Sequence, residues 1–251
     1  MKIDKRKVLL LCMVVAVVIL GLFAVVRGVE KITTKRADTR EGLELIKAEE
    51  SADMSDIENR IKKLDSKKPL TDEEKAARTP KEIFANSVVF GDSIAASFVE
   101  YDKLNTSSVV AESGLQANGA MEYLDTVAGL NPDALFLEFG MNDIASTDGN
   151  TDLFIEHYKE LLDAINEKMP DTRVFVNAIF PVLEKHLEEE PIYSELDKYN
   201  VALKALCDER QITFIDNSDI ATEAYFDEDG VHFIPDFYPI WAARMAEVAA
   251  L

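Results

Sequence analysis

Ser87-Val-Val-Phe-Gly-Asp-Ser93 begins with an apolar run and ends in three small or polar residues. A short apolar run bounded in this way is typical of a buried strand that ends before the polar residues. Four more apolar runs follow it along the chain, at 108–111, 134–139, 173–180 and 212–216. Stretches with helical spacing lie between the later runs and at the end of the chain, at 118–128, 152–169, 193–210 and 235–251.

Strands that are apolar along their whole length and alternate with helices form a parallel sheet that is covered on both faces. The sequence therefore predicts an α/β fold, namely a three-layer α/β/α sandwich around a mostly parallel five-stranded sheet. We expect this domain to span residues 81–251, which is long enough to bury its own core. One predicted helix shows a clear apolar stripe, formed by Phe154, Tyr158, Leu161, Leu162 and Ile165.

The net charge differs sharply between the two parts of the chain. Residues 1–80 hold 17 Lys and Arg against 14 Asp and Glu, whereas residues 81–251 hold 10 against 33. Phosphate binding needs Lys and Arg, so the acidic part is not expected to bind nucleic acid. Its negative field favours neutral or cationic substrates over anionic polymers.

The N-terminal part contains one long apolar run, at residues 8–26. Nineteen helical residues span about 28 Å, close to the hydrocarbon core of a membrane at about 30 Å. Basic residues precede the run, at positions 2, 5, 6 and 7, and they favour a cytoplasmic N-terminus. We expect an uncleaved signal anchor within residues 1–29, which makes the chain a single-pass membrane protein with its acidic domain on the extracytoplasmic side. A cleaved signal peptide and a buried core helix are the alternatives.

Residues 30–80 are rich in charge and contain no aromatic residue. This composition predicts a solvated stalk, helical or flexible, that holds the acidic domain away from the membrane. Four apolar residues in it have the 3-4-3 spacing of a short coiled-coil seam, namely Met54, Ile57, Ile61 and Leu64. Weak self-association through the stalk is therefore a further expectation.

Ser93 directly follows the first predicted strand. Ligands of open parallel sheets bind at the carboxyl ends of the strands, which is where this serine is expected. At the start of the following helix, its hydroxyl would lie where negative charge is favoured, as a nucleophile requires. The alternative is that Ser93 is only the N-cap of that helix.

The motif Gly140-Met-Asn142-Asp follows the third predicted strand and so reaches the same edge of the sheet as Ser93. An acyl-transfer site needs fixed donors for the oxyanion that develops on the substrate, and the side-chain amide of Asn142 can supply one. An ordinary turn at the end of the strand is the alternative, because Gly, Asn and Asp are favoured there.

Asp229-Gly-Val-His232 provides a base with a carboxylate three residues before it. A histidine can take a proton from a serine effectively when an acceptor holds its other ring nitrogen, and Asp229 can reach that nitrogen from the same loop. Asp227 and Glu228 are competing acids, and a buried structural role for His232 is the alternative. The other histidines, His157 and His186, are expected at the surface.

Taken in chain order, these motifs resemble the blocks of the SGNH (GDSL-type) hydrolases, and the resemblance spans about residues 86–251. It implies the flavodoxin-like fold of that family, a triad of Ser93, His232 and Asp229, and an oxyanion hole. The donors of the oxyanion hole would be the N–H groups of Ser93 and Gly114 and the amide of Asn142. Gly119 competes with Gly114 for this role. The chain departs from the usual first block in having Ile94 where Leu is common.

The resemblance implies a serine esterase that forms an acyl-enzyme and needs no metal or cofactor. No cluster of Cys and His in the sequence would hold zinc. An exported, anchored domain suggests an acetyl ester on a cell-envelope carbohydrate as the substrate, although fold alone never names one. The alternatives are a lipid esterase or lysophospholipase, an O-acyltransferase, and an envelope-binding protein that has lost catalysis.

Overall fold

The structure of the protein is a computed structural model that describes residues 77–251. The predicted membrane helix within 1–29 and nearly all of the predicted stalk at 30–80 lie outside the described residues. Among residues 77–251, no helix combines the length and the apolar composition needed to cross a membrane.

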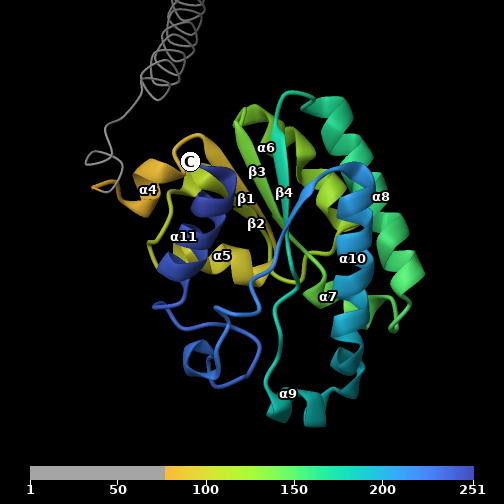
Figure 1. Ribbon diagram of the computed structural model, residues 1–251. Helices are drawn as coiled ribbons and strands as arrows, with labels where there is room; N and C mark the ends of the chain where they lie inside the picture. Colours follow the sequence, from red (N-terminus) through yellow and green to blue (C-terminus); the bar gives the residue numbers. More distant parts are fainter. Residues whose placement is uncertain (1–76) are drawn as a thin grey trace, which may run out of the picture. The chain divides into compact units, whose positions relative to one another are not determined.

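The centre of the domain is a five-stranded sheet (Figure 1) in which every pair of neighbouring strands is parallel. Its order is β2-β1-β3-β4-β5. The strands are β1 (Ser87–Gly91), β2 (Val109–Ala111), β3 (Ala134–Glu138), β4 (Arg173–Asn177) and β5 (Thr213–Ile215). Every residue of β1 and β3 is buried, as expected for central strands that are covered on both faces. The predicted α/β fold with a parallel five-stranded sheet is therefore confirmed.

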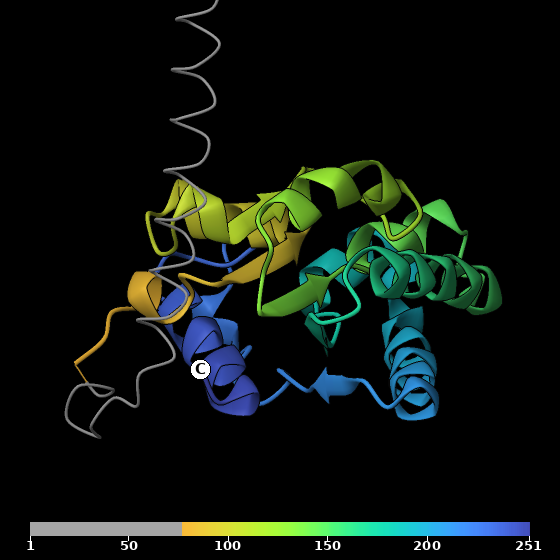
Figure 2. The ribbon, with the colours of Figure 1, turned by 90° about the horizontal axis from the view of Figure 1, so that it is seen from above.

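Helices cover both faces of the sheet. The α-helices are α4 (Pro80–Ile83), α5 (Ser93–Glu100), α6 (Leu124–Gly129), α7 (Met141–Ser146), α8 (Thr151–Lys168), α9 (Glu184–Glu189), α10 (Leu196–Arg210) and α11 (Tyr238–Ala249). Short 3-10 helices are η1 (Thr106–Ser108), η2 (Gly119–Tyr123), η3 (Pro191–Glu195) and η4 (Glu223–Tyr225). Figures 1 and 2 show α5 and α11 on one side of the sheet and α8 and α10 on the other.

Two sets of aromatic side chains anchor these layers. Phe98 of α5 packs against Tyr238 and Trp241 of α11, with ring centroids 5.1 and 4.8 Å apart. On the other face, Phe154 of α8 packs against Tyr199 of α10. The five residues of the predicted apolar stripe on α8 are all buried, so that prediction is confirmed.

The fourth strand is shorter than the apolar run at 173–180 predicted. It ends at Asn177 because the backbone of Ile179 is hydrogen-bonded by a side chain instead of a neighbouring strand. The Ile179 N–H donates to Asn200 Oδ1 at 2.8 Å, and the Ile179 carbonyl accepts from Asn200 Nδ2 at 2.9 Å. An apolar sequence alone does not reveal such a contact with α10.

The register of the sheet sets the position of the site. Gly91, the last residue of β1, pairs with Glu138, the last residue of β3. The segments that follow these two residues therefore leave the sheet side by side. They carry Asp92 and Ser93 after β1, and Gly140 and Asn142 after β3.

Candidate active site

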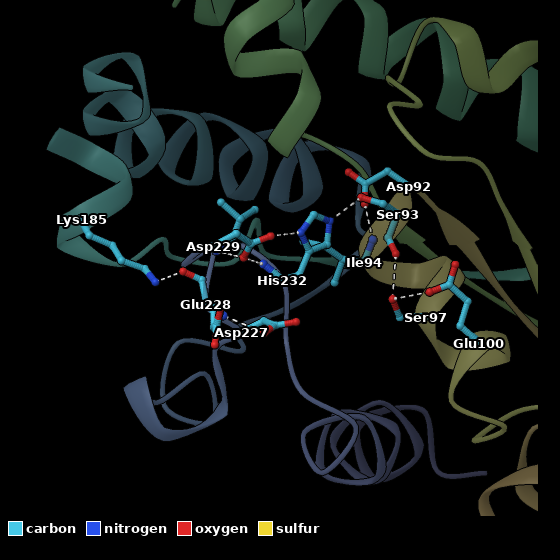
Figure 3. Close-up of polar contacts among 11 residues, drawn as sticks. Asp92, Ser93, Ile94, Ser97, Glu100, Lys185, Asp227, Glu228, Asp229 and His232 are labelled. Atoms are coloured by element: carbon cyan, nitrogen blue, oxygen red, sulfur yellow. Dashed lines mark hydrogen bonds and ion pairs between the residues drawn. The ribbon is translucent and has the colours of Figure 1, made fainter. Parts of the chain in front are cut away.

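Ser93 is the first residue of α5, and its hydroxyl is free of the capping role. The cap is Asp92, whose Oδ1 accepts the Ile94 N–H at 2.9 Å. The alternative that Ser93 is itself the N-cap is therefore wrong. Ser93 Oγ instead lies 2.9 Å from Nε2 of His232, as Figure 3 shows.

His232 lies between Ser93 and a carboxylate from its own loop. Its Nδ1 is 2.6 Å from Oδ2 of Asp229 (Figure 3). The other oxygen, Oδ1, accepts the N–H groups of Val231 and His232, both at 2.9 Å. Three hydrogen bonds thus hold Asp229 in place, and Asp229 holds the imidazole with Nε2 toward the serine.

The electrostatics of Asp229 suit an ionised partner for a histidine. Partial burial acts to raise its pKa, but the hydrogen bonds from the His232 ring and from the N–H groups of Val231 and His232 outweigh this effect. The resulting pKa of Asp229 is about 2. The carboxyl group is therefore charged throughout the neutral range.

The carboxylates of the two competing acids, Asp227 and Glu228, are not hydrogen-bonded to the His232 ring. Asp227 Oδ1 accepts the Glu228 N–H at 2.7 Å, and the Glu228 carbonyl accepts Lys185 Nζ. The Asp227 N–H donates to the His232 carbonyl at 2.8 Å, which closes the loop around Asp229. Of these three acids, only Asp229 has a carboxylate that is hydrogen-bonded to the imidazole.

The other histidine alternatives also fail. His232 is partly exposed, and the neighbouring Phe233 is the residue that packs into the core, against Phe180 and Phe237. His157 and His186, which are predicted at the surface, are partly exposed. Each of them has one buried ring nitrogen without a partner among residues 77–251.

Asn142, the second residue of α7, lies next to both the Ser93 segment and the Gly114 segment. Its Nδ2 donates to Asp92 Oδ2 at 2.7 Å and to the Leu115 carbonyl at 3.3 Å. Gly114 is exposed in the loop after β2 and has a φ of +78°. Gly119 instead begins η2, and among the described residues the Asn142 amide is hydrogen-bonded to Asp92 and Leu115 and not to Gly119. The structure therefore brings Ser93, Gly114 and Asn142 into one region.

Buried carboxyl groups lie beneath this region, and sequence reasoning assigned them no role. Asp92, Glu138 and Asp143 are each at most 1 % exposed. Both oxygens of Asp143 accept the Ala117 N–H, at 3.1 and 3.3 Å, which ties α7 to the loop that carries Gly114. Burial raises the pKa of Asp143 to about 7, although the Ala117 N–H lowers it in part.

A cavity of about 350 Å³ opens beside the serine and the histidine. Most of the side chains that line it are polar. The lining residues are Ser93, Ala96, Ser97, Glu100, Ala111, Glu112, Ser113 and His232. A larger cavity of about 730 Å³ includes Arg173 and Thr213, at the starts of β4 and β5. That end of the sheet is opposite the serine. Of these two cavities, only the smaller one is lined by Ser93 and His232.

The fold and this arrangement define a class, the serine hydrolases built on a parallel α/β sheet. The family model described as GDSL-like Lipase/Acylhydrolase family matches residues 89–239. The chain belongs to this family and is a serine ester hydrolase. No curated protein matches the sequence.

Solved structures share the fold at low sequence identity. A GDSL-like lipase from Bacteroides thetaiotaomicron superposes with a TM-score of 0.55 and 19 % identity, over 71 % of this chain and 96 % of that one. A protein described as a carbohydrate esterase family 3 from Talaromyces cellulolyticus has a TM-score of 0.52 and 18 % identity, over 65 % and 95 %. Both likenesses concern the fold alone.

Proposed function

We propose that this hydrolase cleaves short acyl esters, acetyl esters above all, from a neutral, hydroxyl-rich substrate such as a cell-envelope carbohydrate. The observation that carries the proposal is the continuous chain of contacts from Ser93 Oγ through His232 to Asp229. It provides a nucleophile, a base and an acceptor that orients the base, in the order that acyl transfer requires.

In the proposed mechanism, His232 Nε2 takes the proton of Ser93 as Oγ attacks the ester carbonyl. Asp229 stabilises the imidazolium that forms, since its carboxylate is already charged and in contact. His232 then gives the proton to the alkoxy oxygen, and the alcohol leaves. Water, activated by the same histidine, attacks the acyl-enzyme and releases the acid together with free Ser93.

The oxyanion would form beside the N-terminus of α5. The N–H groups of Ser93 and Gly114 are two proposed donors, and the Asn142 amide is the third. Asn142 Nδ2 has two hydrogens, of which one is held firmly by Asp92 at 2.7 Å. The other faces the Leu115 carbonyl at 3.3 Å, and this weaker contact is the one that the oxyanion would replace.

The cavity supports a small acyl group on a polar substrate. It is small, and two carboxylates, Glu100 and Glu112, line it together with hydroxyl groups. Carboxylates accept hydrogen bonds from sugar hydroxyls and repel anionic groups, as does the strongly acidic domain as a whole. A long acyl chain would find little apolar surface among these lining residues.

We also propose where in the cell the protein is located. A membrane anchor within residues 1–29 and a stalk at 30–80 would hold the esterase domain at the outer face of the cell membrane, near envelope glycans. Fractionation tests this part: the full chain should stay with membranes in alkaline carbonate and be released by detergent. Recovery in the soluble fraction, or a mature N-terminus beyond residue 26, would contradict the anchor.

The activity is tested by acetate release from a chromogenic acetyl ester, with the detergent-solubilised full chain beside Ser93→Ala. We expect turnover in the wild type and none above background in the variant. Esters of longer acyl chains, assayed in parallel, should be poorer substrates. Equal inertness of two folded proteins toward all these esters would favour a non-catalytic binding role, and preference for long chains would favour a lipid esterase.

A further inference from the structure

Glu138 is a buried acid inside an otherwise apolar strand, and the proposed mechanism gives it no task. It ends β3, opposite Gly91 in the register, and is 1 % exposed. Its side chain makes a hydrogen bond with the carboxyl group of Asp92, which is also 1 % exposed. A buried charge is costly unless it is paired, so two touching carboxyl groups cannot both remain ionised there.

The hydrogen-bond partners indicate which of the two carries the proton. Asp92 accepts two N–H donors, from Ile94 at 2.9 Å and from Asn142 at 2.7 Å, and both stabilise its ionised form. The Glu138 carboxyl group also accepts two backbone N–H groups, from Asp92 and Ala95, but its Oε2 receives no donor from any described residue. Burial and the adjacent charge of Asp92 both raise the pKa of Glu138 well above its ordinary range. Glu138 is therefore the protonated partner, and its O–H donates to Asp92.

The backbone of β1 is shaped to admit this carboxyl group. A Cβ placed on Gly91 would lie 2.8 Å from Glu138 Oε2 and 2.6 Å from the Glu138 carbonyl oxygen. Any side chain at position 91 would thus displace either Glu138 or the end of the strand. The glycine before Asp92 gives the two carboxyl groups room to meet.

We infer that Glu138 is a positioning residue for the oxyanion hole, acting through Asp92 on the amide of Asn142. Asp92 receives three donors, which come from β3, from the first turn of α5 and from α7. Together they fix Asn142, the proposed donor, relative to Ser93, the proposed nucleophile. This inference rests on the proposed function, because it assigns Asn142 an interaction made in the transition state.

The experiment compares Glu138→Leu with Glu138→Gln in the full chain, on the same acetyl ester. Leu removes the donor to Asp92, whereas the Gln side-chain amide can still donate. We expect Glu138→Leu to lower kcat about 10- to 100-fold with little change in KM, since oxyanion donors act mainly in the transition state. Glu138→Gln should retain kcat within about threefold, because one donor replaces another.

Phe136→Leu is the matched control, since it changes a fully buried side chain of the same strand that packs against Phe84 and Phe175. It should leave kcat unchanged even though it lowers the melting temperature. Equal losses of kcat in Phe136→Leu and Glu138→Leu would show a merely structural effect and overturn the inference. Full activity of Glu138→Leu, or equal loss in Glu138→Gln, would overturn it too.

A double-mutant cycle with Asn142→Ala tests the route. If Glu138 acts through Asn142, the effect of Glu138→Leu should largely disappear once the amide is gone. If Glu138→Leu does not fold, Asp92→Asn takes its place in the same cycle, and additive losses contradict the inference in either case.

Ser93→Ala separates the proposed function from the positioning role of Glu138. A wild type as inert as Ser93→Ala would contradict the proposed function. An active wild type with unaffected Glu138 variants would contradict only the positioning role.

Discussion

Two groups of polar residues meet at the carboxyl edge of the sheet, and they differ most in burial. The side chains of His232 and Asp229 are 39 % and 50 % exposed, and a short loop holds them through its own backbone. Asp92, Glu138 and Asp143 are at most 1 % exposed and connect three separate elements of the fold. In the first group a proton must move between Ser93 and His232, beside a carboxylate that stays ionised and partly exposed. The second group must keep its geometry, and burial makes its hydrogen bonds strong and its groups hard to move.

The difference predicts that changes in the exposed group affect rate far more than stability. His232→Ala should lower kcat by at least about 10⁴-fold, and Asp229→Asn by about 10²- to 10⁴-fold, because the base or its orienting acceptor is lost. His232→Ala should leave the melting temperature nearly unchanged, and Asp229→Asn should lower it modestly, because the hydrogen bonds that lower the pKa of Asp229 also stabilise the loop. Ester hydrolysis and thermal unfolding, measured side by side, check this.

Asp227→Asn is the matched control for Asp229→Asn, since it alters an acid two residues earlier that does not contact the imidazole. Its activity should remain within about twofold of the wild type. Equal losses in the two variants would mean that the charge of the loop, and not the carboxylate on Nδ1, supports the reaction.

Asn142 contacts the buried group through Asp92 and is a proposed oxyanion donor, so its removal should affect rate at an intermediate level. Asn142→Ala should lower kcat about 10²- to 10³-fold with KM nearly unchanged, as loss of one oxyanion donor does. Asn118→Ala is a suitable control, because Asn118 is exposed and its side chain makes no capping bond. A rise in KM at constant kcat for Asn142→Ala would indicate ground-state binding instead.

Asp143 should affect stability, and its effect should depend on pH. An unfolded aspartate has a pKa of about 3.9, whereas in the folded protein the pKa is about 7. At pH values between these two pKa values, Asp143 holds a proton in the folded protein and releases it in the unfolded chain. The free energy of unfolding therefore falls as pH rises, by up to about 1.4 kcal/mol per pH unit. Asp143→Asn removes this dependence.

Urea unfolding of wild type and Asp143→Asn near pH 5 and near pH 8 measures the contribution. The stability of the wild type relative to the variant should decline from the lower to the higher pH. A constant difference between the two proteins would show that the buried carboxyl group does not change its pKa on folding.

Two glycines near the site should affect stability to different degrees. Gly114 is exposed, with a φ of +78° and nothing within 4 Å of an added Cβ, so Gly114→Ala should cost only about 1 kcal/mol. Gly140 is buried, with a φ of +135°, and its Cβ would lie 2.3 Å from Ile179 Cδ1. Gly140→Ala should therefore cost about 3 kcal/mol. Equal midpoints of urea unfolding for the two variants would contradict this contrast in packing.

The same contrast explains what could be predicted from the sequence. The exposed group depends on local spacing: Asp229 reaches His232 because three residues separate them, and apolar runs placed Ser93 and Asn142 at the end of strands. The buried group depends on register, which the sequence does not show. Nothing in the run at 134–139 reveals that Glu138 faces Gly91, although a Glu within an apolar strand was a signal of an unusual environment.

Two smaller differences have the same origin. The end of β4 at Asn177 is set by Asn200, which is distant in sequence, and the capping of α5 by Asp92 depends on backbone geometry at a single residue. The five-stranded sheet and the helices α8, α10 and α11 followed from periodicity, whereas the short helices α7 and α9 did not, and the predicted helix at 118–128 is divided into η2 and α6. Contacts between distant segments did not follow from periodicity, because each depends on how the whole domain packs.

The most direct test of the account is covalent labelling of the full chain with a fluorophosphonate, followed by peptide mass mapping. We predict one adduct, on Ser93, which forms rapidly in the wild type, much more slowly in His232→Ala and not at all in Ser93→Ala. An adduct on another residue, or labelling of Ser93 at the same rate without His232, would contradict the proposal that this histidine activates this serine.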